Sequence, residues 1–160
     1  MTRTVLQSDL NDVNVKAFLK LLRYCEHRKE DDGVYYIVYG GARFTDTKAH
    51  PHIVVFDKSD KAKKNPHTPA GAYQITYVTW TGAKKLGVVS DFTPAQQDKL
   101  AVWLIDGEGA LDDVKAGRLE AAYGKLKGRW SSLPGATQSH VSAADAKARF
   151  DRYVAEYSKK

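Results

Sequence analysis

Glu26 is the residue whose type and position are best suited to acid catalysis. It follows Leu22 by one helical turn and Phe18 by two, so its side chain points along an apolar face where the expected helix ends. Apolar walls disfavour a charged carboxyl group, and the partial negative charge at a helix C-terminus acts in the same direction, so we expect a raised pKa. A carboxylic acid that stays protonated near neutral pH can protonate a glycosidic oxygen. On the local pattern alone, a partly exposed glutamate at a fraying helix end is the commoner interpretation.

A second carboxylate is the usual requirement for glycoside hydrolysis. The acidic residues just after Glu26 lie in a charged stretch that is typical of a solvated turn. Asp46 is the better candidate because it follows a predicted strand, although a turn-capping aspartate is the somewhat commoner arrangement. Both interpretations of Asp46 remain open at this point.

The histidines do not predict a metal centre. His50 and His52 flank Pro51 and could share a face, but no cysteine or glutamate completes a compact set of ligands. We therefore expect a loop or packing role for them, and neither a metal nor another cofactor.

The elements that position these residues are mostly helical. Apolar residues recur every fourth position over residues 12–26, which predicts an amphipathic helix. The β-branched and aromatic runs at 35–39 and 52–56 predict short strands, and the lysine- and proline-containing stretch 57–71 predicts a long surface loop. Further helices are expected over 73–86, from the capping box at Thr93, along the stripe from Leu119 to Trp130, and after the capping serine Ser142. The pattern predicts a helix-dominated α+β domain.

Composition limits the classes of protein that the chain could represent. Its 160 residues suit one domain, predicted to span 1–160, and leave no room for a separate cofactor-binding half. The net charge of +6 favours an anionic partner such as nucleic acid, a membrane surface or a cell-wall polymer. Cys25 is the only cysteine, which excludes an internal disulfide and a thiolate-rich zinc site. The N-terminal segment has no continuous apolar stretch, so export and membrane anchoring are disfavoured.

Four distinctive segments follow one another from about Ala17 to Ala136, namely AFLKLLRYCE, YYIVYGGARFTDTKAHP, TPAGAYQITYVTW and RWSSLPGA. In this order they resemble the bacteriophage lambda endolysin family, which consists of lysozyme-like lytic transglycosylases acting on peptidoglycan. The resemblance implies a lysozyme-like domain with a small antiparallel sheet beside the active-site cleft.

The resemblance also implies roles for individual residues. Glu26 matches the catalytic glutamate, which protonates the leaving oxygen and then serves as a base. The family motif continues after LPGA with tyrosine, glycine and glutamine, whereas Thr137-Gln138-Ser139 follows here, so Gln138 would replace that glutamine in a shifted register. The implied substrate-binding residues are Phe44, Asp46, His50, Tyr73, Gln74 and Gln138. Tyr73 is expected to face the substrate.

Three functions remain as hypotheses. The preferred one is cleavage of the MurNAc-GlcNAc β-1,4 bond by transglycosylation with a single glutamate, which forms 1,6-anhydro-MurNAc. A hydrolytic muramidase that uses a second carboxylate such as Asp46 is the alternative. A basic, non-catalytic module that binds cell wall or nucleic acid belongs to another class, and the scattered lysines disfavour nucleic acid.

The resemblance implies peptidoglycan glycan strands as the partner of a monomeric enzyme, without nucleic acid or stable membrane insertion. A free endolysin would wait in the host cytoplasm and reach the periplasmic wall after a holin permeabilises the membrane. A virion-associated lytic domain is the other possibility.

Overall fold

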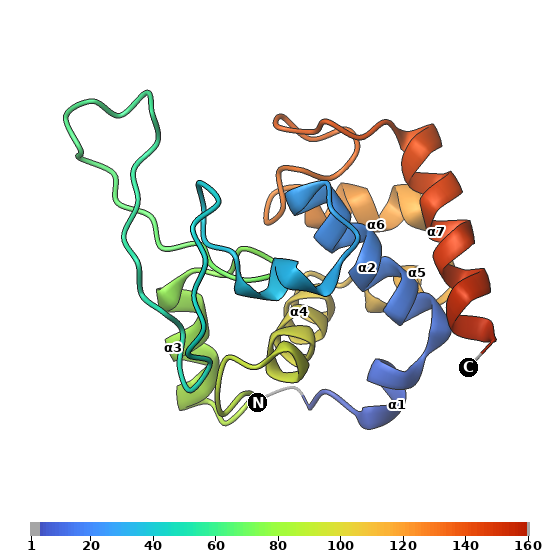
Figure 1. The fold of residues 1–160 in the computed structure, drawn as a ribbon. Helices are drawn as coiled ribbons and strands as arrows, with labels where there is room; N and C mark the ends of the chain where they lie inside the picture. The colour runs from blue at the N-terminus through green and yellow to red at the C-terminus, as the bar shows by residue number, and fades with distance from the viewer. Residues whose placement is uncertain (1–3, 160) are drawn as a thin grey trace. The chain divides into compact units, whose positions relative to one another are not determined.

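The computed structural model describes residues 4–159, which fall into two compact units. We call residues 4–30 and 101–159 the helical unit, and residues 31–100 the loop unit. In chain order the elements are α1 (Gln7–Asn11), α2 (Val13–His27), the 3-10 helix η1 (Asp32–Tyr36), α3 (Tyr77–Lys85), α4 (Pro94–Gly107), α5 (Leu111–Lys115), α6 (Leu119–Leu126) and α7 (Ala143–Ser158) (Figure 1).

Helix α2 forms the centre of the helical unit and confirms the helix predicted there. The Asp12 side chain accepts a hydrogen bond from the Val15 N–H at 3.0 Å, which caps the start of the helix. Its apolar stripe is buried, including Phe18 and Leu22, and it packs mainly against α7 and also against α1 and α5. The helix ends where Arg28 adopts a left-handed conformation with φ of 51°.

The two predicted capping boxes are each realised in part. Thr93 accepts from the Gln96 N–H at 3.4 Å, but the Gln96 side chain bonds to the Ser90 N–H instead of returning to Thr93. Ser142 accepts from the Asp145 N–H at 3.1 Å and starts α7. Local side-chain chemistry therefore placed both helix starts correctly.

The small sheet is not found in the described part of the chain. Residues 32–36 form η1 because the Asp31 side chain accepts from the Gly33 N–H at 2.9 Å and closes a tight turn. The run at 52–56 starts at His52, whose φ of 52° is incompatible with a strand. The loop unit instead contains isolated antiparallel bridges, which are Ile37 to Arg43, Val38 to Ala70, Val55 to His67 and Ala70 to Ile75.

The helix predicted over 73–86 begins later, at Tyr77. Gln74 has a left-handed φ of 50°, so the helix does not extend back through it, and Thr76 provides the cap. The predicted end at residue 86 is confirmed to within one residue, because α3 ends at Lys85 and Gly87 follows with φ of 76° and its N–H bonded to the Lys84 carbonyl.

Residues 57–71 form the predicted surface loop, drawn in green in Figure 1. The bridge between Val55 and His67 closes the base of its outer part through two hydrogen bonds of 2.7 and 2.8 Å. Asp60 orders the tip by accepting from the N–H groups of Lys64 and Asn65. Among residues 4–159, no helix has the length and apolarity needed to cross a membrane.

Candidate active site

Glu26 lies in the last turn of α2, and its side chain is half-buried. Burial raises its pKa to about 6 because the surroundings disfavour the charged carboxylate. The Ser132 hydroxyl acts in the opposite direction by favouring the charged form. The structure thus confirms the direction of the pKa shift expected from the position of Glu26 on the helix.

The segment after α6 brings Ser132 to Glu26. Trp130 is buried and its carbonyl accepts from the Leu133 N–H at 3.2 Å, which makes a tight turn around Ser132. The Ser132 hydroxyl is buried without a fully formed hydrogen bond among the described residues. It is therefore available to respond to the charge on Glu26. Sequence analysis missed Ser132 because its partner lies more than 100 positions away in the chain.

Gln138 folds back onto the same segment. Its N–H donates to the Ser131 carbonyl at 3.0 Å, and its side-chain oxygen accepts from the Ser131 hydroxyl at 2.9 Å. The residue is exposed, and its amide nitrogen has no hydrogen-bond partner within residues 4–159. Gln138 thus has one fixed oxygen and one donor directed to solvent.

The turn after Glu26 is held by two arginines of α7. Glu30 accepts from Arg149 at 2.7 Å and from Arg152 at 2.6 and 2.8 Å. Burial raises the pKa of Glu30, but the arginines outweigh this effect and leave the pKa lowered. The Arg149 guanidinium also lies 3.7 Å from the centre of the Tyr24 ring. Glu30 is therefore a structural anion, and it is unsuited to act as a second acid.

Asp46 is exposed and caps a turn. Its Oδ1 accepts from the Lys48 N–H at 2.9 Å, which is the turn-capping arrangement considered from the sequence.

Two of the predicted binding residues, Phe44 and His50, are buried in the aromatic core of the loop unit. The ring of Phe92 lies 5.9 Å from that of Phe44 and 4.9 Å from that of His50. His50 Nε2 lies 2.7 Å from the Ile75 carbonyl, and Nδ1 accepts from the His52 N–H at 3.0 Å. These contacts place the proton of the neutral ring on Nε2, and burial lowers its pKa. Within residues 4–159, no group of three or more His, Cys, Asp or Glu side chains is placed to hold a metal ion.

Tyr73 is fully buried, so the structure does not show the expected exposed ring. Its hydroxyl donates to Asp98 Oδ1 at 2.5 Å, and the same oxygen accepts from the Tyr35 hydroxyl at 2.8 Å. The neighbouring Gln74 donates through Nε2 to the carbonyls of Ile37 and Gly71. Both side chains therefore fasten segments of the loop unit together.

Gln97 is an organising residue that the sequence analysis missed. It is 1% exposed, accepts from the Ala72 N–H, and donates to the carbonyls of Tyr35 and Phe92. A Cβ atom at Gly71 would meet the Gln97 side-chain oxygen at 2.3 Å, so glycine is required there. Its position on the face of α4 gives no sequence signal for these three hydrogen bonds, because the backbone groups of Tyr35, Ala72 and Phe92 approach it only in the folded protein.

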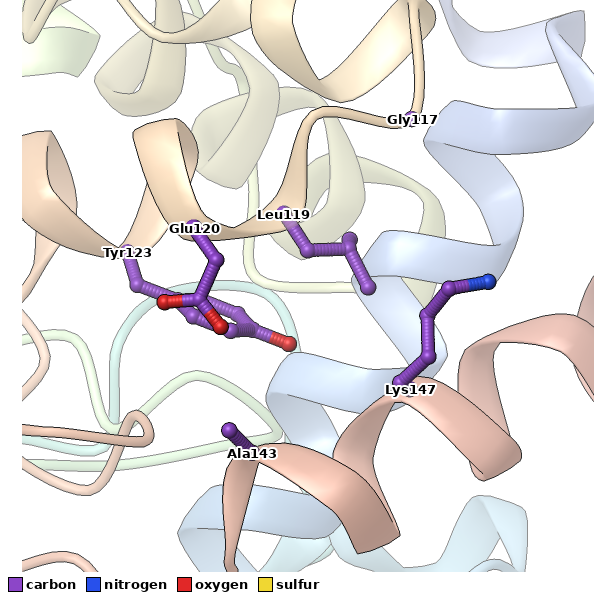
Figure 2. Close-up of a pocket in the computed structure, with 6 residues that line it drawn as sticks. All are labelled: Gly117, Leu119, Glu120, Tyr123, Ala143 and Lys147. Atoms are coloured by element: carbon purple, nitrogen blue, oxygen red, sulfur yellow. The ribbon is translucent and has the colours of Figure 1, made fainter.

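Each unit has a surface pocket. The pocket of the helical unit has a volume of about 330 Å³ and lies between α6 and the start of α7 (Figure 2). Its Lys147 is ion-paired with Asp151, and the Tyr123 hydroxyl is buried without a hydrogen-bond partner among the described residues. The pocket of the loop unit has a volume of about 400 Å³ and is lined by Tyr36, Arg43, Phe44 and Thr45.

Comparisons with known proteins agree on one family. A sequence model described as Endolysin matches residues 16–160. The chain is 36% identical to the endolysin of Escherichia phage P2 over 137 residues, which cover 77% of this chain and 81% of that protein. It is 34% identical to the endolysin of Escherichia phage lambda over 126 residues, which cover 76% and 77% of the two chains.

Solved structures give the same result. A structure of bacteriophage lambda lysozyme complexed with a chitohexasaccharide matches with a TM-score of 0.75 and 32% identity, covering 88% of this chain and 94% of that one. A second structure of lysozyme from bacteriophage lambda matches with a TM-score of 0.66 and 27% identity, covering 92% and 93%. The fold is therefore lysozyme-like, and the chain belongs to the endolysin family of peptidoglycan-degrading enzymes.

Proposed function

We propose that this endolysin is a lytic transglycosylase that cleaves the β-1,4 bond between MurNAc and GlcNAc, with Glu26 as its only catalytic carboxyl group. The observation that carries the proposal is the half-buried Glu26, whose pKa of about 6 suits a group that first donates and then accepts a proton. The chitohexasaccharide in the lambda lysozyme complex supports a β-linked glycan as the substrate.

The reaction that we propose uses one carboxyl group twice. Glu26 donates its proton to the leaving glycosidic oxygen as the bond from that oxygen to C1 of MurNAc breaks. The C6 hydroxyl of the same MurNAc attacks C1, and the Glu26 carboxylate takes the hydroxyl proton. The products are a 1,6-anhydro-MurNAc end and a GlcNAc with a free hydroxyl, and no water is consumed. Ser132 supports the step after proton donation, when Glu26 is a carboxylate, because it favours the charged form of Glu26.

The other residues of the proposed site have different roles. We assign Gln138 to substrate binding because its amide nitrogen faces solvent. Phe44, His50, Tyr73 and Gln74 shape the loop unit from within, because their side chains are committed to packing or to backbone carbonyls. Asp46 is exposed and lies in the same unit, where it would contact substrate through its second oxygen.

Hydrolysis is the second candidate, in which Asp46 would activate a water molecule. It is favoured only by the exposure of that carboxylate. The turn-capping bond from Lys48 and the ion pairs of Glu30 favour the single-acid mechanism.

The decisive experiment is digestion of purified peptidoglycan by the wild type and by Glu26→Gln, followed by mass spectrometry of the released muropeptides. We expect the wild type to release products lighter by one water than muramidase products, and Glu26→Gln to lose at least about 100-fold in activity, because general acid catalysis contributes on that order. An Asp46→Asn variant serves as the comparison and should retain the same products. Reducing-end muramic acid as the sole wild-type product would overturn the transglycosylase mechanism, and an active Glu26→Gln enzyme would overturn the role of Glu26.

We further propose that the protein acts as a monomer and does not use nucleic acid as a partner. As a free endolysin it would remain in the host cytoplasm until a holin opens the membrane, and it would then act on the wall in the periplasm. Fractionation of infected cells before and after membrane permeabilisation tests this route. We expect the active enzyme in the cytoplasmic fraction before permeabilisation and in the periplasm afterwards, whereas enzyme recovered with purified virions would favour the virion-associated alternative.

A further inference from the structure

The pocket of the loop unit combines an apolar wall with the side chain of Arg43, which forms no ion pair among the described residues. Its four lining residues come from the end of η1 and from the segment that returns after the turn at Gly40 and Gly41. The two segments are joined by the bridge between Ile37 and Arg43 and by the bond from the Phe44 N–H to the Tyr36 carbonyl at 3.0 Å. The local backbone therefore fixes the pocket.

Two aromatic rings form the wall. The rings of Tyr36 and Phe44 lie 6.1 Å apart at 55°, and Phe44 rests in turn on Phe92. Phe44 is buried, whereas Tyr36 is partly exposed. A partly exposed tyrosine on a rigid support offers a flat apolar surface with a polar edge, which suits the face of a sugar ring.

Arg43 provides the charge. The residue is exposed, and the contact of its guanidinium is a long hydrogen bond of 3.4 Å to the Gly33 carbonyl. No carboxylate of residues 4–159 forms an ion pair with it, and the nearby Asp31 is bonded to the Gly33 N–H. A Cβ at Gly33 would lie 2.7 Å from both Arg43 Nη2 and Asp31 Oδ1, so both side chains pass close to the Gly33 backbone. The planar guanidinium thus remains free to bind a carboxylate through two parallel hydrogen bonds.

We propose that this pocket recognises the carboxylates that peptidoglycan carries on its muramic acid substituents, with the sugar ring against Tyr36 and the carboxylate on Arg43. Arg43 is then a specificity-determining residue that distinguishes peptidoglycan from neutral glycans such as chitin oligomers. The inference rests on the proposed peptidoglycan substrate, and it adds the chemical group by which that substrate is selected.

The test measures binding in a Glu26→Gln background, so that the ligand stays intact. One ligand is soluble glycan strands with native stem peptides, and the other is the same strands with their carboxyl groups converted to amides. We expect Arg43→Gln to weaken binding of the native strands about tenfold and to leave the amidated strands nearly unchanged, because the variant loses the charge-assisted pair of hydrogen bonds to the carboxylate. Arg43→Lys should recover part of the lost affinity, since lysine keeps the positive charge but cannot form two parallel hydrogen bonds to one carboxylate.

Two further variants complete the design. Lys85→Gln removes the same charge from an exposed position at the end of α3, and it should change the affinity for either ligand less than about twofold. Tyr36→Ala should weaken both ligands alike, because the ring contacts the sugar in either case. Equal losses with Arg43→Gln on both ligands, or no loss on native strands, would overturn the role of Arg43, and an unaffected Tyr36→Ala would overturn the pocket as the site.

The experiments separate an error in the role of Arg43 from an error in the proposed enzymatic mechanism. If Arg43→Gln in an otherwise wild-type chain still releases anhydro products, and Arg43→Gln in the Glu26→Gln background binds both strand types as before, the enzyme assignment stands and only the specificity inference falls. If wild type releases no anhydro product while the charge-dependent binding is observed, the mechanism falls and the pocket stands.

Discussion

The catalytic proposal depends on how one carboxyl group is held between its two protonation states. Burial favours the neutral form of Glu26, while Ser132 favours the charged form, and the pKa of about 6 is the result of both. A purely apolar pocket would raise the pKa further, which keeps more of the group protonated at neutral pH but makes it an intrinsically weaker acid. In the proposed mechanism Ser132 is therefore a positioning residue, which acts through the protonation state of Glu26.

Replacing Ser132 by alanine should shift the pH dependence of catalysis. The variant lacks the group that favours the charged carboxylate, so the pKa of Glu26 rises and the alkaline limb of the kcat/KM profile moves to higher pH. The measurement is the initial rate of muropeptide release across the pH range. Ser8→Ala, an exposed serine on α1, is the control and should reproduce the wild-type profile. An alkaline limb that is unmoved or shifted to lower pH would contradict the role given to Ser132.

At the scale of elements, α7 supports the end of α2. Arg149 and Arg152 pair with Glu30, and Arg149 stacks on Tyr24, so the turn after Glu26 is fixed from outside the helix. Such partly exposed ion pairs each contribute little, but one guanidinium here makes several contacts.

Arg149→Ala should lower the free energy of unfolding by about 1–2 kcal/mol, since it removes a cation–π contact and ion pairs to Glu30 and Asp145. Urea denaturation followed by circular dichroism measures the change. The matched variant is Lys147→Ala on the same helix, whose exposed pair with Asp151 is worth less than about 0.5 kcal/mol. Equal effects of the two variants would show that Arg149 has no special role.

The elements that could be predicted from sequence are those with local signals. Helices α2, α4 and α7 were placed because their apolar periods and capping residues lie within a few positions of each other. The strands were wrong because Asp31 and the left-handed His52 override the β-branched pattern. Helix α3 starts later than predicted for a similar reason. Gln74 has a left-handed backbone conformation, which its residue type does not reveal.

The candidate site shows the same division. The position of Glu26 on its helix made it a candidate, and the resemblance matched it to the family's glutamate. Ser132, and the α7 arginines that bind Glu30, were missed because they approach the end of α2 only through tertiary folding. Tyr73 was expected to face substrate, but the hydroxyl is taken by Asp98, 25 positions further along the chain.

At the scale of the whole molecule, Glu26 should decrease stability at neutral pH. Its pKa is raised in the folded state, so the carboxyl group is neutral in both states below pH 4.5, and above pH 6 the folded state must ionise it where charge is disfavoured. The cost is about 2 kcal/mol above pH 6 and disappears toward pH 4.5.

Glu26→Gln should therefore raise the free energy of unfolding by about 2 kcal/mol at pH 7 and by much less at pH 4.5. Urea denaturation at several pH values measures the difference. Glu120→Gln, an exposed glutamate on α6, is the comparison, and its difference from wild type should not depend on pH in this way. A stabilisation by Glu26→Gln that is the same at both pH values would contradict ionisation as its cause.

Cys25 gives this chain a built-in reporter beside Glu26, the proposed catalytic residue. It is the only cysteine, it is buried, and burial together with the neighbouring Glu26 raises the pKa of its thiol to about 12. A thiol-reactive dye can label the protein only when the end of α2 opens and the sulfur becomes exposed. The rate of labelling therefore reports local opening beside Glu26, and the measurement needs no introduced cysteine.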